Sequence, residues 1–142
     1  MGTVRQLLEE KGHQVWSIAP DATVYDALAL MAAQDIGSLA VLQDGRLVGL
    51  ISERDYSRKV ILKGRHSKDT PVRDIMATRM PYAQPEQTVE ECMAIVTDQR
   101  VRHLPVLEDG RLIGIVSIGD LVKAIIDEQQ FIIDQLVHYI NS

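Results

Sequence analysis

Apolar residues recur at helical spacing in two segments of the chain that start 65 residues apart. In one segment they fall at positions i, i+3, i+4 and i+7 counted from Val24, and in the other at the same spacing from Val89. Thr23 and Thr88 precede these positions, and an acidic residue follows each threonine three residues later. That arrangement is typical of a capping box. The pattern therefore predicts two matched amphipathic helices.

Each predicted helix is followed by two apolar runs around an Asp-Gly pair, "SLAVLQDGRLVGLIS" from Ser38 and "HLPVLEDGRLIGIVS" from His103. Asp-Gly between apolar runs predicts a β-hairpin. Both hairpins end in Ser-x-x-Asp, at Ser52 and Ser117, which predicts the start of another capped helix. The short runs "VWSIA" and "MPYAQ" precede the first helices and predict one more strand each. Each unit is therefore expected to be strand–helix–strand–strand–helix.

The two halves align without a gap at an offset of 65, from Pro20 and Pro85 to Tyr56 and Leu121. Two lead-in segments, "VRQLL" and "VRDIM", also match one another, at an offset of 68. A repeat of this length indicates two similar units that bury their apolar faces against each other.

The chain's expected division follows from the repeat and from a polar, charged stretch, "KGRHSKDT". A lead-in helix is expected before each unit, and the tail predicts a terminal helix with a wide apolar stripe. That helix should pack on the body or on a second copy. The expected segments are a first unit with its lead-in helix at 1–62, a linker at 63–70, a second unit with its lead-in helix at 71–127, and a C-terminal helix at 128–142.

Composition narrows the class of protein. Of the 142 residues 46% are hydrophobic but only 4% aromatic, so the core should be aliphatic. The net charge of −5 and the pI near 5.3 disfavour nonspecific nucleic-acid binding. The single cysteine, Cys92, allows no intrachain disulfide, which fits a reducing compartment. The N-terminus has no apolar signal region and no run approaches a membrane span, so a soluble cytoplasmic protein is expected.

The motifs "GLISERD" at 49–55, "GIVSIGD" at 114–120 and "RHLPVLEDGRLIGIVS" at 102–117 resemble those of the cystathionine-β-synthase (CBS) domain. Two such units in tandem resemble the CBS pair, or Bateman module, here as a stand-alone protein of bacterial type. The resemblance implies an α/β (α+β) fold whose two units are related by a pseudo-twofold axis and pack through their sheets, with an extra C-terminal helix.

The resemblance also implies a function. CBS pairs are regulatory, signal-transduction modules that bind adenosine-containing ligands in the clefts between their units and carry out no chemistry. The ligands are AMP, ADP, ATP, NAD(H) or S-adenosylmethionine, with AMP as the first candidate here and NAD or ATP as alternatives. A homodimer and a regulated partner of unknown identity are also implied. The alternative is a ligand-free module for dimerisation or partner docking.

Asp55 and Asp120 are the first candidates for contact with ligand. By resemblance, each carboxylate accepts hydrogen bonds from both ribose hydroxyls. Each can also serve simply as the third residue of a capping box, and the two roles are compatible. Ser52 and Ser117 are N-caps whose hydroxyls can reach ligand as well.

The two copies differ where phosphate is expected. Arg54 could make a charge-assisted phosphate contact, although a solvated arginine is the plain alternative. Gly119 stands at the matching place and offers no charge. Arg102 and His103 are a basic pair that the resemblance directs toward phosphate, with a structural histidine as the alternative. The two clefts are therefore expected to be unequal.

Trp16 and Tyr82 occupy nearly matching places, where they could flank an adenine or simply cover the core. The resemblance assigns nucleotide binding to these further positions: Trp16, Ser17, Ile18, Gly37, Ser38, Leu39, Ala40, Tyr82, Ala83, Leu104 and Pro105. The four histidines are scattered and Cys92 lies on an apolar helix face, so no metal site, catalytic residue or catalytic cofactor is expected.

Overall fold

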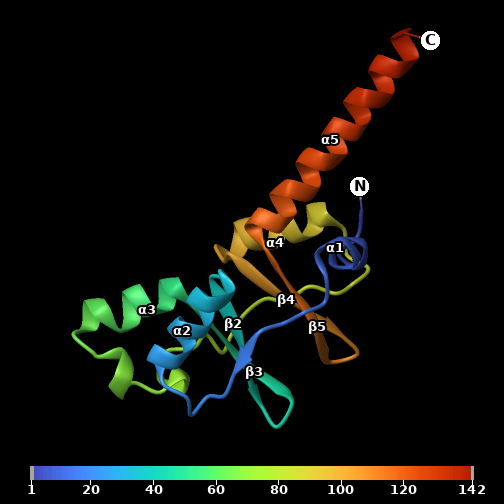
Figure 1. The fold of residues 1–142 in the computed structure, drawn as a ribbon. Helices are drawn as coiled ribbons and strands as arrows, with labels where there is room; N and C mark the ends of the chain where they lie inside the picture. The colour runs from blue at the N-terminus through green and yellow to red at the C-terminus, as the bar shows by residue number, and fades with distance from the viewer. Residues whose placement is uncertain (1, 142) are drawn as a thin grey trace. The chain divides into compact units, whose positions relative to one another are not determined.

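The chain folds into two compact units, and the computed structural model describes residues 2–141 (Figure 1). Unit 1 joins the N-terminal residues 2–13 to residues 81–141, and unit 2 consists of Gln14–Met80. Both are mixed α/β structures. Among the described residues, no helix combines the length and the hydropathy that crossing a bilayer would require.

Unit 2 is built on a three-stranded sheet. Its elements are β1 (Ser17–Ile18), α2 (Val24–Gln34), β2 (Ser38–Gln43), β3 (Arg46–Ser52), α3 (Glu53–Lys59) and the 3₁₀ turns η1 (Ile61–Lys63), η2 (Ser67–Asp69) and η3 (Val72–Asp74). The strand order is β1-β2-β3, with β1 parallel to β2 and β2 antiparallel to β3. Asp44 and Gly45 have φ values of 51° and 78°, so the Asp-Gly turn that the sequence predicts is present.

Unit 1 repeats this arrangement around a two-stranded sheet. Its elements are α1 (Val4–Lys11), α4 (Val89–Gln99), β4 (His103–Glu108), β5 (Arg111–Ser117) and α5 (Ile118–Asn141). In place of the strand expected at "MPYAQ", Ala83 makes an isolated parallel bridge with Val106. The hairpin turn at Asp109 and Gly110 matches that of unit 2, with φ values of 51° and 79°.

Each unit has its own aliphatic core, as the composition predicts. In unit 2, α2 buries Val24 and Met31 against the sheet residues Val41 and Ile51. In unit 1 the core has the same plan, and its fully buried residues include Val4, Leu8, Cys92, Leu104, Val106, Val116 and Leu121.

The lead-in segments pack in a way that the expected division did not foresee. The segment before each repeat docks on the other repeat: Val4 N donates to Gln87 O at 2.9 Å, and Val72 N donates to Ala22 O at 2.8 Å. Helix α1 therefore belongs with the second repeat rather than with residues 14–62. The sequence gives no sign of this exchange, because the two lead-in segments resemble each other.

Two further differences concern helix lengths. The second lead-in segment forms only the 3₁₀ turn η3, because Pro71 provides no side-chain cap, whereas Thr3 and Gln6 close a full capping box at α1. The expected C-terminal helix is present, but as the second half of α5 rather than as a separate element. Helix α5 runs unbroken from Ile118 to Asn141, since no glycine or proline interrupts it after Gly119.

Candidate ligand-binding site

The start of α3 holds Asp55 by a reciprocal set of hydrogen bonds. Asp55 N donates to Ser52 Oγ at 3.1 Å, and Ser52 N donates to Asp55 Oδ2 at 3.0 Å. Ser52 Oγ also lies 3.1 Å from the same carboxylate oxygen. The carboxylate is thereby fixed at the point where β3 becomes α3, with 18% of its side chain exposed.

The start of α5 holds Asp120 in the same way. Asp120 N donates to Ser117 Oγ at 3.0 Å, and Ser117 N donates to Asp120 Oδ2 at 2.8 Å. The Asp120 side chain is 26% exposed. The two first-ranked candidates are thus equivalent in local structure, as the repeat predicts.

A lysine accompanies each aspartate, and the sequence analysis did not select either one. In unit 2, Lys59 Nζ lies 3.3 Å from Asp55 Oδ1 and donates to Ile75 O at 3.0 Å. In unit 1 the cation is Lys11, at the end of α1. Asp55 and Lys59 are four residues apart in one helix, a spacing at which ion pairs are common. The pairing of Lys11 with Asp120 depends instead on where α1 docks.

Lys11 bridges two parts of unit 1. Its Nζ donates to Asp120 Oδ2 at 2.5 Å and to Ile115 O at 2.6 Å. Burial by itself would raise the pKa of Asp120, but the hydrogen bonds from Lys11 and Ser117 outweigh it and lower the pKa below its usual value. Asp120 is therefore an ionised acceptor in a polar setting.

The strand side of unit 2 brings the other candidates up to Asp55. Ala40 N donates to Trp16 O at 3.1 Å, so Trp16 and the strand β1 that follows it lie beside β2. Gly37 O accepts a hydrogen bond from Glu53 N at 3.1 Å. These pairings place one end of the sheet next to the first turn of α3.

Within that region the side chains differ in exposure. Trp16 is half-buried and Arg54 is exposed. Ser38, Leu39 and Ala40 are buried. Any contact of a ligand with these three residues would therefore fall mainly to backbone atoms.

Unit 1 assembles the matching region. Ala83 N donates to Pro105 O, and Leu107 N donates to Ala83 O, both at 2.9 Å. Ile118 N donates to Arg102 O at 2.9 Å, which brings the basic pair to the start of α5.

His103 lies opposite Ser117 in the hairpin register. Arg102 and Gly119 are exposed and His103 is half-buried. Ala83, Leu104 and Pro105 are buried. Each unit thus carries a half-site, defined here as the capping Ser-Asp pair with the adjoining strand ends.

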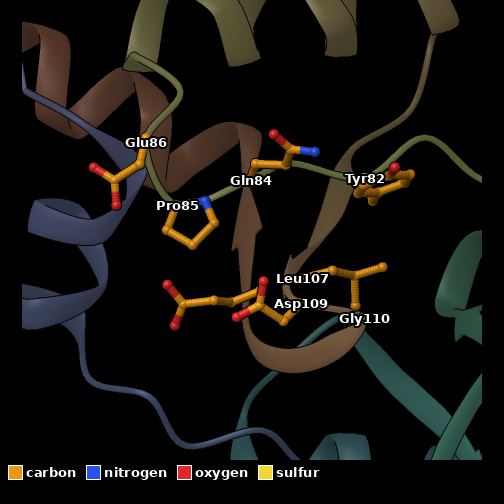
Figure 2. A pocket seen from close by; sticks show the side chains of 8 residues that line it. Tyr82, Gln84, Pro85, Glu86, Leu107, Asp109 and Gly110 are labelled. Atoms are coloured by element: carbon orange, nitrogen blue, oxygen red, sulfur yellow. The ribbon is translucent and has the colours of Figure 1, made fainter.

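A hollow of about 400 Å³ in unit 1 lies away from Asp120 and contains one candidate residue, Tyr82. Figure 2 shows Tyr82 and Glu86 at opposite ends of this hollow, with Gln84 and Pro85 between them. Its lining includes Glu86, Glu108 and Asp109, so it is unsuited to phosphate. Arg5 bonds to both Glu86 and Glu108, and these hydrogen bonds raise its pKa.

Metal-ligating residues do not gather at either half-site. Across residues 2–141 the structure contains no group of three or more His, Cys, Asp or Glu side chains placed to hold a metal ion.

Comparison with known proteins finds one domain family twice in the chain. The model of the CBS domain matches residues 4–61 and again residues 72–127. The mitochondrial CBS domain-containing protein CBSX3 of Arabidopsis thaliana is 40% identical over 150 residues, covering 99% of this chain and 72% of its own.

Solved structures agree with this match. The CBS domain structure of NE2398 is 52% identical and superposes with a TM-score of 0.85, covering 88% of this chain and 98% of its own. The CBS domain pair of MJ0100 shares the fold at 18% identity, with a TM-score of 0.80 over 90% of this chain and 98% of its own.

Proposed function

Because the chain belongs to the CBS domain family and carries two such domains in tandem, we propose that it senses an adenosine-containing ligand through Asp55 and Asp120. CBS domain pairs are regulatory modules. In this proposal each aspartate accepts hydrogen bonds from the hydroxyls of a ribose.

The observation that carries the proposal is the pair of matched aspartates. Each is fixed by a serine at a strand-to-helix junction, and each keeps part of its carboxylate exposed. A fixed, ionised carboxylate can accept two hydrogen bonds from neighbouring hydroxyls without reorganising, which favours a ribose over a sugar that lacks them.

The rest of the proposed site follows from the half-sites. Arg54, Arg102 and His103 would meet phosphate, since exposed guanidinium groups can make charge-assisted bonds to phosphate oxygens. Trp16 and Tyr82 would flank the adenine, and backbone groups of the adjoining strand ends would read its edge. Gly119, at the place that matches Arg54, has no side chain, and a Cβ there would make an ordinary contact with Ser117 Oγ at 3.6 Å.

We propose AMP as the first ligand to test, followed by ADP, ATP, NAD(H) and S-adenosylmethionine. The structure of the MJ0100 domain pair was determined with 5′-methylthioadenosine and S-adenosylmethionine. That protein shares the fold, and its ligands support the ligand class without choosing among its members.

The test is thermal unfolding of the full chain with each ligand at millimolar concentration. A ligand that binds only the folded state raises the melting temperature by mass action. The double variant Asp55→Asn, Asp120→Asn should lose this rise. The control Asp44→Asn, Asp109→Asn makes the same change at the matched hairpin turns and should keep it. If no adenosine ligand moves the wild-type melting temperature, the proposal fails.

Regulation would follow from differential affinity. A ligand changes the arrangement of the chain only as far as it binds one arrangement better than another. We propose a cytoplasmic homodimer whose regulated partner is unknown, with no nucleic-acid or membrane partner and no catalytic activity. Self-association is seen in a relative: the CBS-CP12 protein of bloom-forming cyanobacteria, 28% identical here, is hexameric.

A second candidate function is a ligand-free module for dimerisation or partner docking. The exposed apolar side chains along α5 favour this function. This function would be favoured over sensing if no nucleotide changes the melting temperature and the chain still self-associates.

A further inference from the structure

The second half of α5 exposes a row of large apolar side chains. Figure 1 shows this helix continuing beyond α1 and α4 of the same unit toward the C-terminus. About half or more of each side chain is exposed, from 49% at Ile132 to 79% at Tyr139. We call this set the α5 stripe: Ile126, Ile132, Ile133, Leu136, Val137, Tyr139 and Ile140.

The stripe has the spacing of a helix-packing face. Ile126, Ile133 and Ile140 are one heptad apart, and the other members flank them within about 160° of the helix circumference. The same side of the helix already packs on the core of unit 1 in its first turns, through Leu121 and Ile125. The stripe therefore continues a packing face beyond the part of α5 that packs on the core of unit 1.

Apart from Phe131, the opposite side of the helix is polar, and two pairs of its side chains hydrogen-bond within the helix. Lys123 Nζ donates to Asp127 at 2.8 Å, and the Gln130 amide donates to Asp134 at 2.9 Å. From residue 124 to residue 141 the helix has three acids and no lysine or arginine. An anionic membrane surface or a nucleic acid would be repelled by this segment. A neutral, apolar helix face would not be repelled by it.

We propose that the α5 stripe packs along the α5 stripe of a second copy of this chain, as a parallel helix pair. The stripe exposes on the order of 800 Å², about what one partner contributes to a standard interface. Two copies can meet stripe to stripe with Asp127 and Asp134 pointing away from the seam. Most soluble homo-oligomers are closed twofold dimers.

The parallel direction follows from Gln129, the one polar residue inside the stripe. In a parallel pair each Gln129 amide meets the Gln129 amide of the other copy, and the two can hydrogen-bond. In an antiparallel pair crossing at Ile133, Gln129 would face Val137 and lose that partner. The inference specifies the surface for the proposed homodimer and does not depend on ligand binding.

The first test compares two aspartate substitutions on the same helix. Ile133 lies in the centre of the stripe, and Phe131 is similarly exposed on the other side. Sedimentation equilibrium should give twice the chain mass of 15.9 kDa for the wild type and for Phe131→Asp. Ile133→Asp should sediment as a monomer, with association at least 100-fold weaker. Residue 133 lies beyond the core, so the far-UV spectrum should be unchanged.

Two results would overturn the inference in different ways. If Ile133→Asp dimerises as strongly as the wild type, the stripe is not the interface, although the chain is still a homodimer. A wild type that is monomeric at every concentration would remove the homodimer as well. Binding of that monomer to neutral vesicles would point to a lipid surface instead. Nucleotide binding is measured separately and is unaffected by these outcomes.

The second test determines whether the two α5 helices run parallel or antiparallel. Ile140→Cys alone should form a disulfide-linked dimer on mild oxidation, while wild type should not, because Cys92 is buried. A cross-link that forms only when Ile126→Cys and Ile140→Cys proteins are mixed would overturn the parallel arrangement.

Discussion

The two aspartates that open α3 and α5 occupy the same capping box, but they obtain their lysines by different routes. Asp55 pairs with Lys59, one turn later in its own helix. Asp120 pairs with Lys11, which is 109 residues away and belongs to α1. The repeat therefore fixes the local geometry of both half-sites, whereas the docking of a lead-in segment determines the electrostatic surroundings of one.

The different origin of the lysines affects how each aspartate is held. Movement of α1 would alter the surroundings of Asp120. In unit 1 the paired lysine comes from α1, whereas in unit 2 it comes from α3 itself and also donates to Ile75 O. Each half-site has one lysine, so the lysines differ in their origin and not in their charge, and the two copies differ in charge at the matched positions Arg54 and Gly119.

The largest expected effect is the protection of the buried thiol in unit 1 from chemical labelling. Burial raises the pKa of Cys92 to about 11. Its labelling by iodoacetamide at pH 8 should therefore be about 100-fold or more slower than that of a free cysteine. Ala27 occupies the matched place in unit 2 and is also fully buried. Ala27→Cys in a Cys92→Ala background should be protected similarly. Fast labelling at one position only would show that the two cores are not equivalent.

The next contrast lies where the lead-in segments cross the hairpins. A Cβ on Gly49 would come within 2.9 Å of the backbone oxygen of Ala77, whereas the atoms nearest to a Cβ on Gly114 belong to the buried side chain of Leu8, from 2.6 Å. A side chain can change its rotamer more readily than the backbone can move. We expect Gly49→Ala to cost about 2–3 kcal/mol and Gly114→Ala about 1 kcal/mol. Urea unfolding monitored by far-UV circular dichroism measures both. A larger loss for Gly114→Ala would contradict this packing.

The smallest contrast is between the lysines. Lys11→Met should lower the free energy of unfolding at pH 7 by about 0.5–1 kcal/mol, and Lys59→Met by about 0.3–0.5 kcal/mol. Folding lowers the pKa of Asp120, so its ion pair stabilises above the unfolded pKa of about 4. That contribution disappears as the pH falls through the lower folded pKa. The stability lost in Lys11→Met should therefore shrink in acid to the part that comes from the lost hydrogen bond to Ile115 O, as urea unfolding at pH 7 and at pH 2.5 would show. An equal loss of stability at both pH values would contradict the ion pair between Lys11 and Asp120.

Much of this structure could be predicted from the sequence, because short-range patterns determine it. The Asp-Gly turns, the capping serines and the spacing from Val24 and Val89 each depend on residues a few positions apart. The repeat then predicted that Asp55 and Asp120 would be equivalent, and the structure confirms their matched capping boxes.

The remainder depends on which segments dock together. No local pattern distinguishes α1 packing on its own repeat from α1 packing on the other, so Lys11 could not be assigned to Asp120. Pro71 in place of a capping threonine could have warned that the second lead-in would be short. The unbroken α5 was also foreseeable, since no helix breaker separates its two predicted parts.

The most direct test of the account is calorimetric titration of AMP, and then of the other adenosine ligands, into wild type, Asp55→Asn and Asp120→Asn. We expect two unequal sites in the wild type and the loss of a different one in each variant, with at least about tenfold weaker binding there. A wild type that binds none of these ligands, or binding that neither substitution changes, would contradict it.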